Sequence, residues 1–173
     1  TDEGIKIDNR NTIYKCCIKI VRQMTKFRKQ EKPYSCGASA IKNCLIALDR
    51  IDISERRIRL LSKTTAEGTD EVGLAKAIER LGYVPELFET KTEDTFKRYL
   101  IDGLKAGSMF IVLTDSGNHW IALVSYRNKY FEFVDSDFKR KLQTATCKDF
   151  LLVAKNIDKF RKKEIYFAVK ISR

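Results

Sequence analysis

The stretch QEKPYSCGASAIKNC, residues 30–44, places a thiol where a helix is predicted to begin. Ser35 is the predicted N-cap, which puts Cys36 in the first turn. Apolar residues recur at helical spacing over residues 37–49 and form one face of this helix: Ala40, Ile41, Cys44, Leu45 and Leu48. A free cysteine can be a small buried hydrophobe, but at a helix N-terminus it is held more readily as the nucleophilic thiolate. The stretch therefore raises the hypothesis of a catalytic thiol.

The composition is that of a globular chain. Of the 173 residues, 43% are apolar and 33% are charged, and the length allows a sizeable core. We expect one domain at residues 25–173, preceded by an extension at residues 1–24. No apolar run approaches the 18 or more residues of a membrane span. The polar start of the chain does not have the pattern of a signal peptide, and the missing initiator methionine suggests trimming.

The cysteines and the single histidine argue against a metal site. The five cysteines are an odd number, and no Cys-x-x-Cys pair or Cys/His set occurs at metal-ligand spacing. Cys36 and Cys44 are eight residues apart on one predicted helix, which is too far for a disulfide. We therefore expect no metal, no cofactor and a reducing, cytoplasmic compartment.

The formal net charge of +11 bears on partners. Lysines and arginines cluster at residues 22–32, 139–141 and 155–163. These clusters have three interpretations: a solvated basic surface, attraction for an acidic polypeptide substrate or partner, or nucleic-acid binding. The last has no aromatic-basic recognition motif to support it.

Hydrophobic periodicity changes from helical to alternating along the chain, although residues 13–27 fit both patterns. Helices are predicted after Ser54, after Thr69 or Asp70 with a stop at Gly82, and after Thr92. A further helix is predicted at about residues 147–154, and strands at residues 84–88, 109–115, 119–126, 129–137 and 164–171. Helices first and an antiparallel sheet second define an α+β fold class.

Two of these strands bring candidate partners for the thiol to one edge of the sheet. His119 opens one strand, Asp135 ends the next, and a turn near Asn128 places them roughly opposite one another. A carboxylate there can hold the tautomer and orientation of the imidazole. If the Cys36 helix packs on this sheet, a nucleophile, a base and an orienting residue meet. Gln30 can then donate a side-chain N–H to a developing oxyanion, with the Cys36 backbone N–H as second donor.

Each of these residues also has a purely structural interpretation. A lone cysteine is often a packing residue, His119 can be a satisfied residue of a sheet edge, and Asp135 and Gln30 can be polar loop residues. Asp137 lies two residues after Asp135, on the same face by strand parity, and is the alternative orienting residue. The order and spacing of the set, taken together, favour a thiol hydrolase.

Five stretches resemble the bacteriocin-processing, double-glycine leader peptidase family of cysteine peptidases. QEKPYSCGASAIKNCLIAL resembles its cysteine box, with a glutamine six residues before Cys-Gly, and GTDEVGLAKAIERLGY resembles its next segment. NHWIALVSYRNKYFEFVDS is similar to its histidine and aspartate strands, while TCKDFLLVAK and EIYFAVKI are similar to its closing helix and strand. The resemblance covers roughly residues 25–171, which is nearly the whole chain.

The resemblance implies a papain-like fold in which the N-terminal helices, with the nucleophile at a helix N-terminus, pack on the antiparallel sheet. It implies Cys36 as nucleophile, His119 as general base and acid, Asp135 as orienting residue and Gln30 as oxyanion donor, with cleavage after small, Gly-Gly-like residues. Two features depart from the family. Ser136 follows the aspartate where the family usually has proline, and the sequence holds none of the transporter domains to which many members are fused, so we expect a stand-alone domain.

Other functions remain compatible with the same residues. On the same fold, a deamidase, an acyl transferase or a protease for ubiquitin-like proteins would use cysteine, histidine and aspartate in this order. A non-catalytic peptide-binding module is a second alternative, although the presence of Cys36 counts against it. A nucleic-acid-binding protein is a third, and it predicts affinity that falls steeply with salt.

Overall fold

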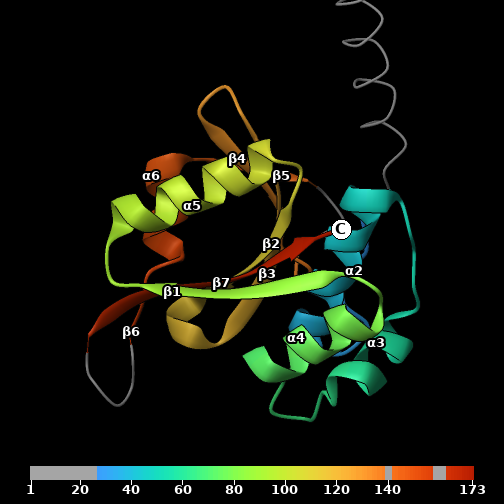
Figure 1. Cartoon of the computed structure of the whole chain (residues 1–173). Helices are drawn as coiled ribbons and strands as arrows, with labels where there is room; N and C mark the ends of the chain where they lie inside the picture. The colour runs from blue at the N-terminus through green and yellow to red at the C-terminus, as the bar shows by residue number, and fades with distance from the viewer. Residues whose placement is uncertain (1–26, 139–141, 158–162) are drawn as a thin grey trace, which may run out of the picture.

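The computed structural model describes residues 27–138, 142–157 and 163–173, and Figure 1 shows their arrangement. The predicted extension at residues 1–24 and nearly all of the ambiguous segment at residues 13–27 lie outside the described residues, so the domain boundary stays a prediction. Within the described part of the chain, no helix is long and apolar enough to cross a membrane.

Helices come first and most strands second, which confirms the predicted α+β class. In chain order the elements are α2 (Cys36–Asp49), α3 (Glu55–Ser62), α4 (Glu71–Arg80), β1 (Val84–Thr90), α5 (Glu93–Lys105), β2 (Met109–Thr114), the 3₁₀ turn η1 (Asp115–Gly117), β3 (His119–Arg127), β4 (Tyr130–Val134), β5 (Gln143–Thr146), α6 (Cys147–Val153), β6 (Asn156–Ile157) and β7 (Glu164–Ser172). The sequence did not predict η1, β5 and β6, because elements this short show no periodicity.

The strands form an antiparallel sheet in the order β1-β7-β2-β3-β4-β5, and β6 pairs with β7. The last strand, β7, inserts between β1 and β2, so the C-terminal segment joins the two halves of the sheet. η1 connects β2 to β3, whose ends pair Thr114 with His119. The predicted turn between β3 and β4 is also present, with positive φ angles at Asn128 and Lys129.

The central strands divide their side chains between two hydrophobic cores, one on each face of the sheet. On β2, Ile111 joins the core formed with α2, α3 and α4, whereas Phe110 and Val112 join the core formed with α5 and α6. Trp120 and Ile121 divide in the same way at the start of β3. Figure 1 shows the two groups of helices on opposite sides of the sheet. Because both faces are covered, β2 and the first half of β3 are apolar runs rather than alternating ones.

The predicted starts of α3 and α4 are confirmed, since the side chains of Ser54 and Asp70 each accept a hydrogen bond from a backbone N–H of the first turn. α2 also begins directly after Ser35, but the Ser35 hydroxyl makes no capping bond to the helix. It donates to the Lys32 carbonyl at 2.9 Å instead. Ser35 therefore tightens the loop that leads into Cys36.

Two glycines allow close approach between helices. An added Cβ at Gly73 would lie 2.4 Å from the Ser62 carbonyl oxygen, so α4 can lie against the end of α3 only without a side chain there. An added Cβ at Gly37 would lie 3.0 Å from the Thr69 Cβ and 3.1 Å from the Leu74 Cδ2. The second residue of α2 is therefore a glycine for reasons of packing.

Candidate active site

The first residue of α2, Cys36, borders a cleft of about 1190 Å³. The cleft is lined by the loop before α2, the segment before α4, η1 and the adjoining ends of β2, β3 and β4. Cys36 is 8% exposed, so its sulfur is largely shielded from solvent while it still reaches the cleft. This is the combination that a protected nucleophile requires.

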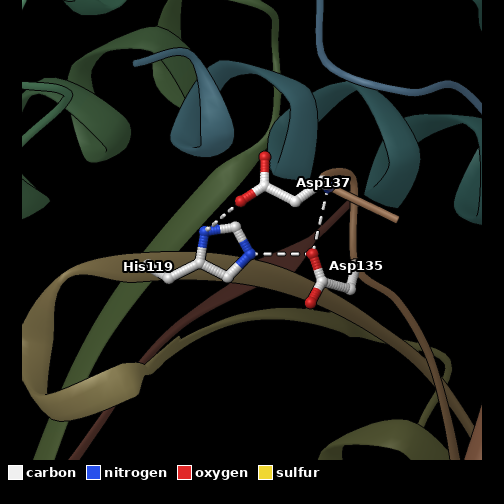
Figure 2. A group of neighbouring side chains, drawn as sticks. All are labelled: His119, Asp135 and Asp137. Atoms are coloured by element: carbon white, nitrogen blue, oxygen red, sulfur yellow. Dashed lines mark hydrogen bonds and ion pairs between the residues drawn. The ribbon is translucent and has the colours of Figure 1, made fainter. Parts of the chain in front are cut away.

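Across the cleft, His119 opens β3 and Asp135 directly follows β4, which ends one residue earlier than predicted, at Val134. The His119 Nε2 lies 2.8 Å from the Asp135 Oδ1, as Figure 2 shows. The same carboxylate oxygen accepts a hydrogen bond from the Asp137 N–H at 3.1 Å. The Asp135 carboxylate is thus fixed by its own chain and holds the imidazole from one side.

The contacts around this pair set its ionisation. Burial by itself would lower the pKa of His119, but hydrogen bonds to Asp135 and Cys36 and the negative charge of both partners raise it to about 10. Burial would raise the pKa of Asp135, but the hydrogen bonds from His119 and from the Asp137 N–H and the charge of the imidazolium lower it. At neutral pH the pair is therefore an imidazolium beside a carboxylate. Cys36 lines the same cleft as His119, so the thiol and the ring share one site.

Asp137 faces the other nitrogen of this ring. Its Oδ2 lies 3.7 Å from the His119 Nδ1, which is beyond hydrogen-bonding distance, and its side chain is half exposed. His119, Asp135 and Asp137 offer ligand atoms within 4.8 Å of one another. Figure 2 shows the two carboxylates on different sides of the imidazole. A cation bound to one ring nitrogen would therefore be next to only one of the two carboxylates. The carboxylate that holds the ring is Asp135.

Gln30 lies in the loop before α2 and is tied to the residue that follows Asp135. The Ser136 hydroxyl donates to the Gln30 Oε1 at 2.9 Å, and the Gln30 backbone N–H donates to the Ser136 carbonyl at 3.2 Å. The Gln30 Nε2 donates to the Pro33 carbonyl at 3.2 Å. The structure therefore places Gln30 at the same corner of the molecule as the other three residues, although its hydrogen bonds run to Ser136 and Pro33 and not to Cys36.

Trp120 links the two walls of the cleft. Its Nε1–H donates to the Thr69 carbonyl at 2.9 Å, and the indole ring lines the cleft. Thr69 also packs against Gly37. The segment that precedes α4 is therefore fastened to both β3 and α2, and these contacts fix the spacing between Cys36 and His119.

Among the basic residues that could attract an acidic substrate, those near Gln30 in the sequence do not line the cleft. Arg28 and Lys29 do not line the cleft, and Arg28 pairs with Asp52 at 2.5 Å. Residues 139–141, which hold the other expected basic group, lie outside the described part of the chain. The charged lining that the structure describes is mainly acidic: Glu67, Asp70, Glu71, Asp115, Asp135, Asp137 and Lys155.

Sequence reasoning gave no site role to Thr69, Trp120 or Ser136. Trp120 directly follows His119, and Ser136 directly follows Asp135. This adjacency to predicted site residues was the one indication in the sequence that either belongs to the site. The bond between Trp120 and Thr69 spans 51 positions of the chain. No local pattern reports a contact of that separation.

The comparisons with known proteins agree on one family and one fold. A profile of the Peptidase C39 family matches residues 24–150. The solved peptidase domain of Streptococcus ComA, a bifunctional ABC transporter of a quorum-sensing pathway, is 18% identical with a TM-score of 0.63, covering 86% of this chain and 98% of that one. A C39-like peptidase from Bacillus anthracis is 10% identical with a TM-score of 0.61, covering 87% and 95%. A double-glycine motif protease of an AMS/PCAT transporter, solved with a leader peptide, is 14% identical with a TM-score of 0.57, covering 84% and 94%.

A comparison with curated protein sequences returned no match. The solved structures, at these identities, confirm the predicted papain-like fold with its N-terminal helices packed on an antiparallel sheet. The profile spans both the Cys36 and the His119 segments and confirms the resemblance drawn from them. The chain belongs to the peptidase C39 family and is a cysteine-type peptidase.

Proposed function

We propose that Cys36 is the nucleophile of this peptidase, His119 its general base and acid, Asp135 the orienting residue and Gln30 a donor to the oxyanion. The observation that carries the proposal is the His119 ring, which bonds Asp135 through Nε2 and also contacts the Cys36 sulfur. Because the Nε2 of His119 is bonded to Asp135, its Nδ1 is the ring nitrogen that can interact with the Cys36 sulfur. A positively charged ring beside a cysteine favours its reaction as a nucleophile.

The proposed reaction has two half-reactions. The Cys36 thiolate attacks the carbonyl carbon of the scissile peptide bond, and the carbonyl electron pair moves onto oxygen, where the Gln30 Nε2–H and the Cys36 backbone N–H stabilise it. His119 gives its proton to the departing amine, the C–N bond breaks and a thioester remains. A water molecule then loses a proton to His119 and attacks the thioester. The C–S bond breaks, the acid product leaves and the thiolate is restored.

The proposed substrate is a polypeptide that is cut after small residues such as Gly-Gly. The similar double-glycine protease was solved with a leader peptide, which supports a polypeptide as the class of substrate here. The acidic lining favours a neutral or basic segment next to Cys36, because carboxylates repel like charges. An acidic substrate, like a nucleic-acid partner, stays a prediction that rests on basic residues outside the described lining.

The same residues serve other acyl-transfer reactions. A deamidase, an acyl transferase and a ubiquitin-like-protein protease would also form a thioester on Cys36 and would differ in the substrate or in the group that accepts the acyl. The cysteines of the described residues, Cys36, Cys44 and Cys147, are free thiols. This supports the reducing, cytoplasmic compartment that we propose for an enzyme whose nucleophile must stay reduced.

The test uses the fluorogenic amide N-acetyl-Gly-Gly-aminomethylcoumarin as a probe. We expect release of coumarin, and an acid quench at early times should leave an acetyl-Gly-Gly group on the peptide that contains Cys36, detectable by mass spectrometry. Cys36→Ala should abolish both signals, whereas the matched control Cys147→Ala should keep both. Transfer of the acyl group to an added amine in preference to water would assign an acyl transferase. Absence of both release and adduct would contradict the proposal.

A further inference from the structure

Ser136 holds Gln30 at two points. The side chain of Ser136 is buried, with only 2% of the residue exposed. Its hydroxyl donates to the Gln30 Oε1 at 2.9 Å, and its carbonyl accepts the Gln30 backbone N–H at 3.2 Å. The first bond fixes the side chain of Gln30 and the second fixes its main chain. The two residues lie 106 positions apart, so this contact joins the end of β4 to the loop before α2.

The two ends of the Gln30 amide meet two different groups, the Pro33 carbonyl and the Ser136 hydroxyl. A carbonyl oxygen can only accept a hydrogen bond, so the Pro33 carbonyl, 3.2 Å away, requires the nitrogen end. The Ser136 hydroxyl, which can donate or accept, donates to the oxygen end here, so the Pro33 carbonyl selects the orientation and Ser136 anchors it. The primary amide has two N–H groups, and the bond to Pro33 uses one of them. Pro33 lines the cleft, so its bond to Nε2 holds the nitrogen end of the amide next to a residue of the cleft wall.

We propose that Ser136 is a positioning residue that anchors the Gln30 amide, so that its nitrogen stays beside Pro33 at the wall of the cleft. The inference rests on the proposed role of Gln30 as oxyanion donor. A reversed amide would place a carbonyl oxygen beside the developing negative charge and would oppose the reaction. Without the hydroxyl, the Gln30 Oε1 loses its donor inside the protein in a part-buried place, and the side chain can take another rotamer.

The kinetic test is a double-mutant cycle with the coumarin probe. Gln30→Ala should lower kcat by about 10²- to 10³-fold, the effect of losing one oxyanion donor. Ser136→Ala should lower kcat by about 10- to 100-fold with KM nearly unchanged, because the donor is present but misplaced. The double variant should fall no further than Gln30→Ala. Independent, multiplying losses would overturn the inference, because Ser136 would then act through something other than Gln30.

A second readout separates positioning of Gln30 from support of the neighbouring Asp135. Iodoacetamide alkylates Cys36 by displacement at carbon, a reaction that forms no oxyanion. Ser136→Ala should therefore leave the rate and pH profile of Cys36 alkylation unchanged while kcat falls. A changed profile would show that the hydroxyl supports the His119–Asp135 pair, and the inference would be wrong.

A third readout does not depend on turnover. In ¹H–¹⁵N spectra, Ser136→Ala should shift and broaden the side-chain NH₂ resonances of Gln30, and unchanged resonances would overturn the inference. The matched control is Ser108→Ala, which removes the hydroxyl of another buried serine, 7% exposed, between α5 and β2 and outside the cleft. It should leave these resonances and kcat unchanged. If Gln30→Ala keeps full kcat, the proposed function of Gln30 fails, while the spectra still decide whether Ser136 orients its amide.

Discussion

Helix α2 carries two buried cysteines about two turns apart, and their surroundings are opposite in kind. Cys36 begins the helix at the cleft, where its sulfur meets the His119 ring. Cys44 lies in the middle of the helix with no exposed surface, and its Sγ lies 3.4 Å from the Phe110 carbonyl oxygen. Burial raises the pKa of the Cys44 thiol, so this thiol is uncharged at neutral pH.

The two sites show that reactivity follows from neighbours and not from burial. Both residues are buried by the measure of exposed surface, at 8% for Cys36 and 0% for Cys44. One of them faces an imidazolium that stabilises a negative charge, and the other is enclosed by the apolar core. A low exposed fraction therefore accompanies a charged neighbour in the first case, and in the second it raises the pKa of the thiol.

The largest expected difference between the two cysteines appears when each is replaced in turn by serine. Cys36→Ser should reduce hydrolysis of the probe to background, because a serine hydroxyl beside an imidazolium has no thiolate to offer. Cys44→Ser should keep kcat within a few-fold of the original, since Cys44 takes no part in the reaction. In parallel, iodoacetamide at pH 6 should label Cys36 and leave Cys44 unlabelled in a peptide map. Labelling of Cys44 in the folded protein would break the comparison.

A smaller effect is expected when the group behind His119 is changed. Asp135→Asn removes the carboxylate that raises the pKa of His119, and kcat/KM should fall by about 10²- to 10⁴-fold, the usual contribution of general acid–base catalysis. In the original protein, activity should fall as pH rises through about 10, where His119 loses its proton. In Asp135→Asn this alkaline limb should move to lower pH, because the imidazolium is less stabilised.

The pH–rate profile with the coumarin probe measures that shift, and Asp137→Asn is the matched control. Asp137 lies 3.7 Å from the other ring nitrogen, so its amide should move the alkaline limb less than the amide at Asp135. A larger shift in Asp137→Asn would mean that Asp137 is the orienting residue.

The smallest effect is expected at Cys44 and concerns stability. Cys44→Ala removes a fully buried sulfur from the core and should lower the free energy of unfolding by about 1 kcal/mol, near the centre of the range for single substitutions. Urea unfolding followed by circular dichroism measures this change, and the probe assay measures kcat on the same sample. Retained stability together with lost activity would place Cys44 in the reaction and contradict its assignment to the core.

Much of the fold could be predicted because its signals are local. The capping residues Ser54 and Asp70 and the apolar runs of β2 and β3 report structure within a few positions of the chain. The pairing of His119 with Asp135 follows from a hairpin, in which a short turn makes neighbours of two strands. The catalytic roles themselves came from the order of these residues and from the resemblance, and they stay proposals.

The rest of the site could not be predicted because its contacts join segments far apart in the chain. Ser136 was noted only as a departure from proline, although its hydroxyl bonds Gln30 across 106 positions. The charge of the cleft could not be predicted for the same reason. Arg28 is near Gln30 in sequence, yet its guanidinium turns to Asp52. Proximity along the chain does not determine which side chains face a cleft.

The close fit of Gly37 against Thr69 and Leu74 has a consequence for the history of such chains. The glycine of the Cys-Gly pair is required by the way α2 meets the segment before α4, whereas the cysteine is required by the chemistry. A substitution can therefore replace Cys36 while Gly37 is kept. A descendant that loses peptidase activity is free to replace Cys36 and still has to keep Gly37. We expect the glycine to outlast the cysteine among relatives, so that it marks shared ancestry while the cysteine marks retained catalysis.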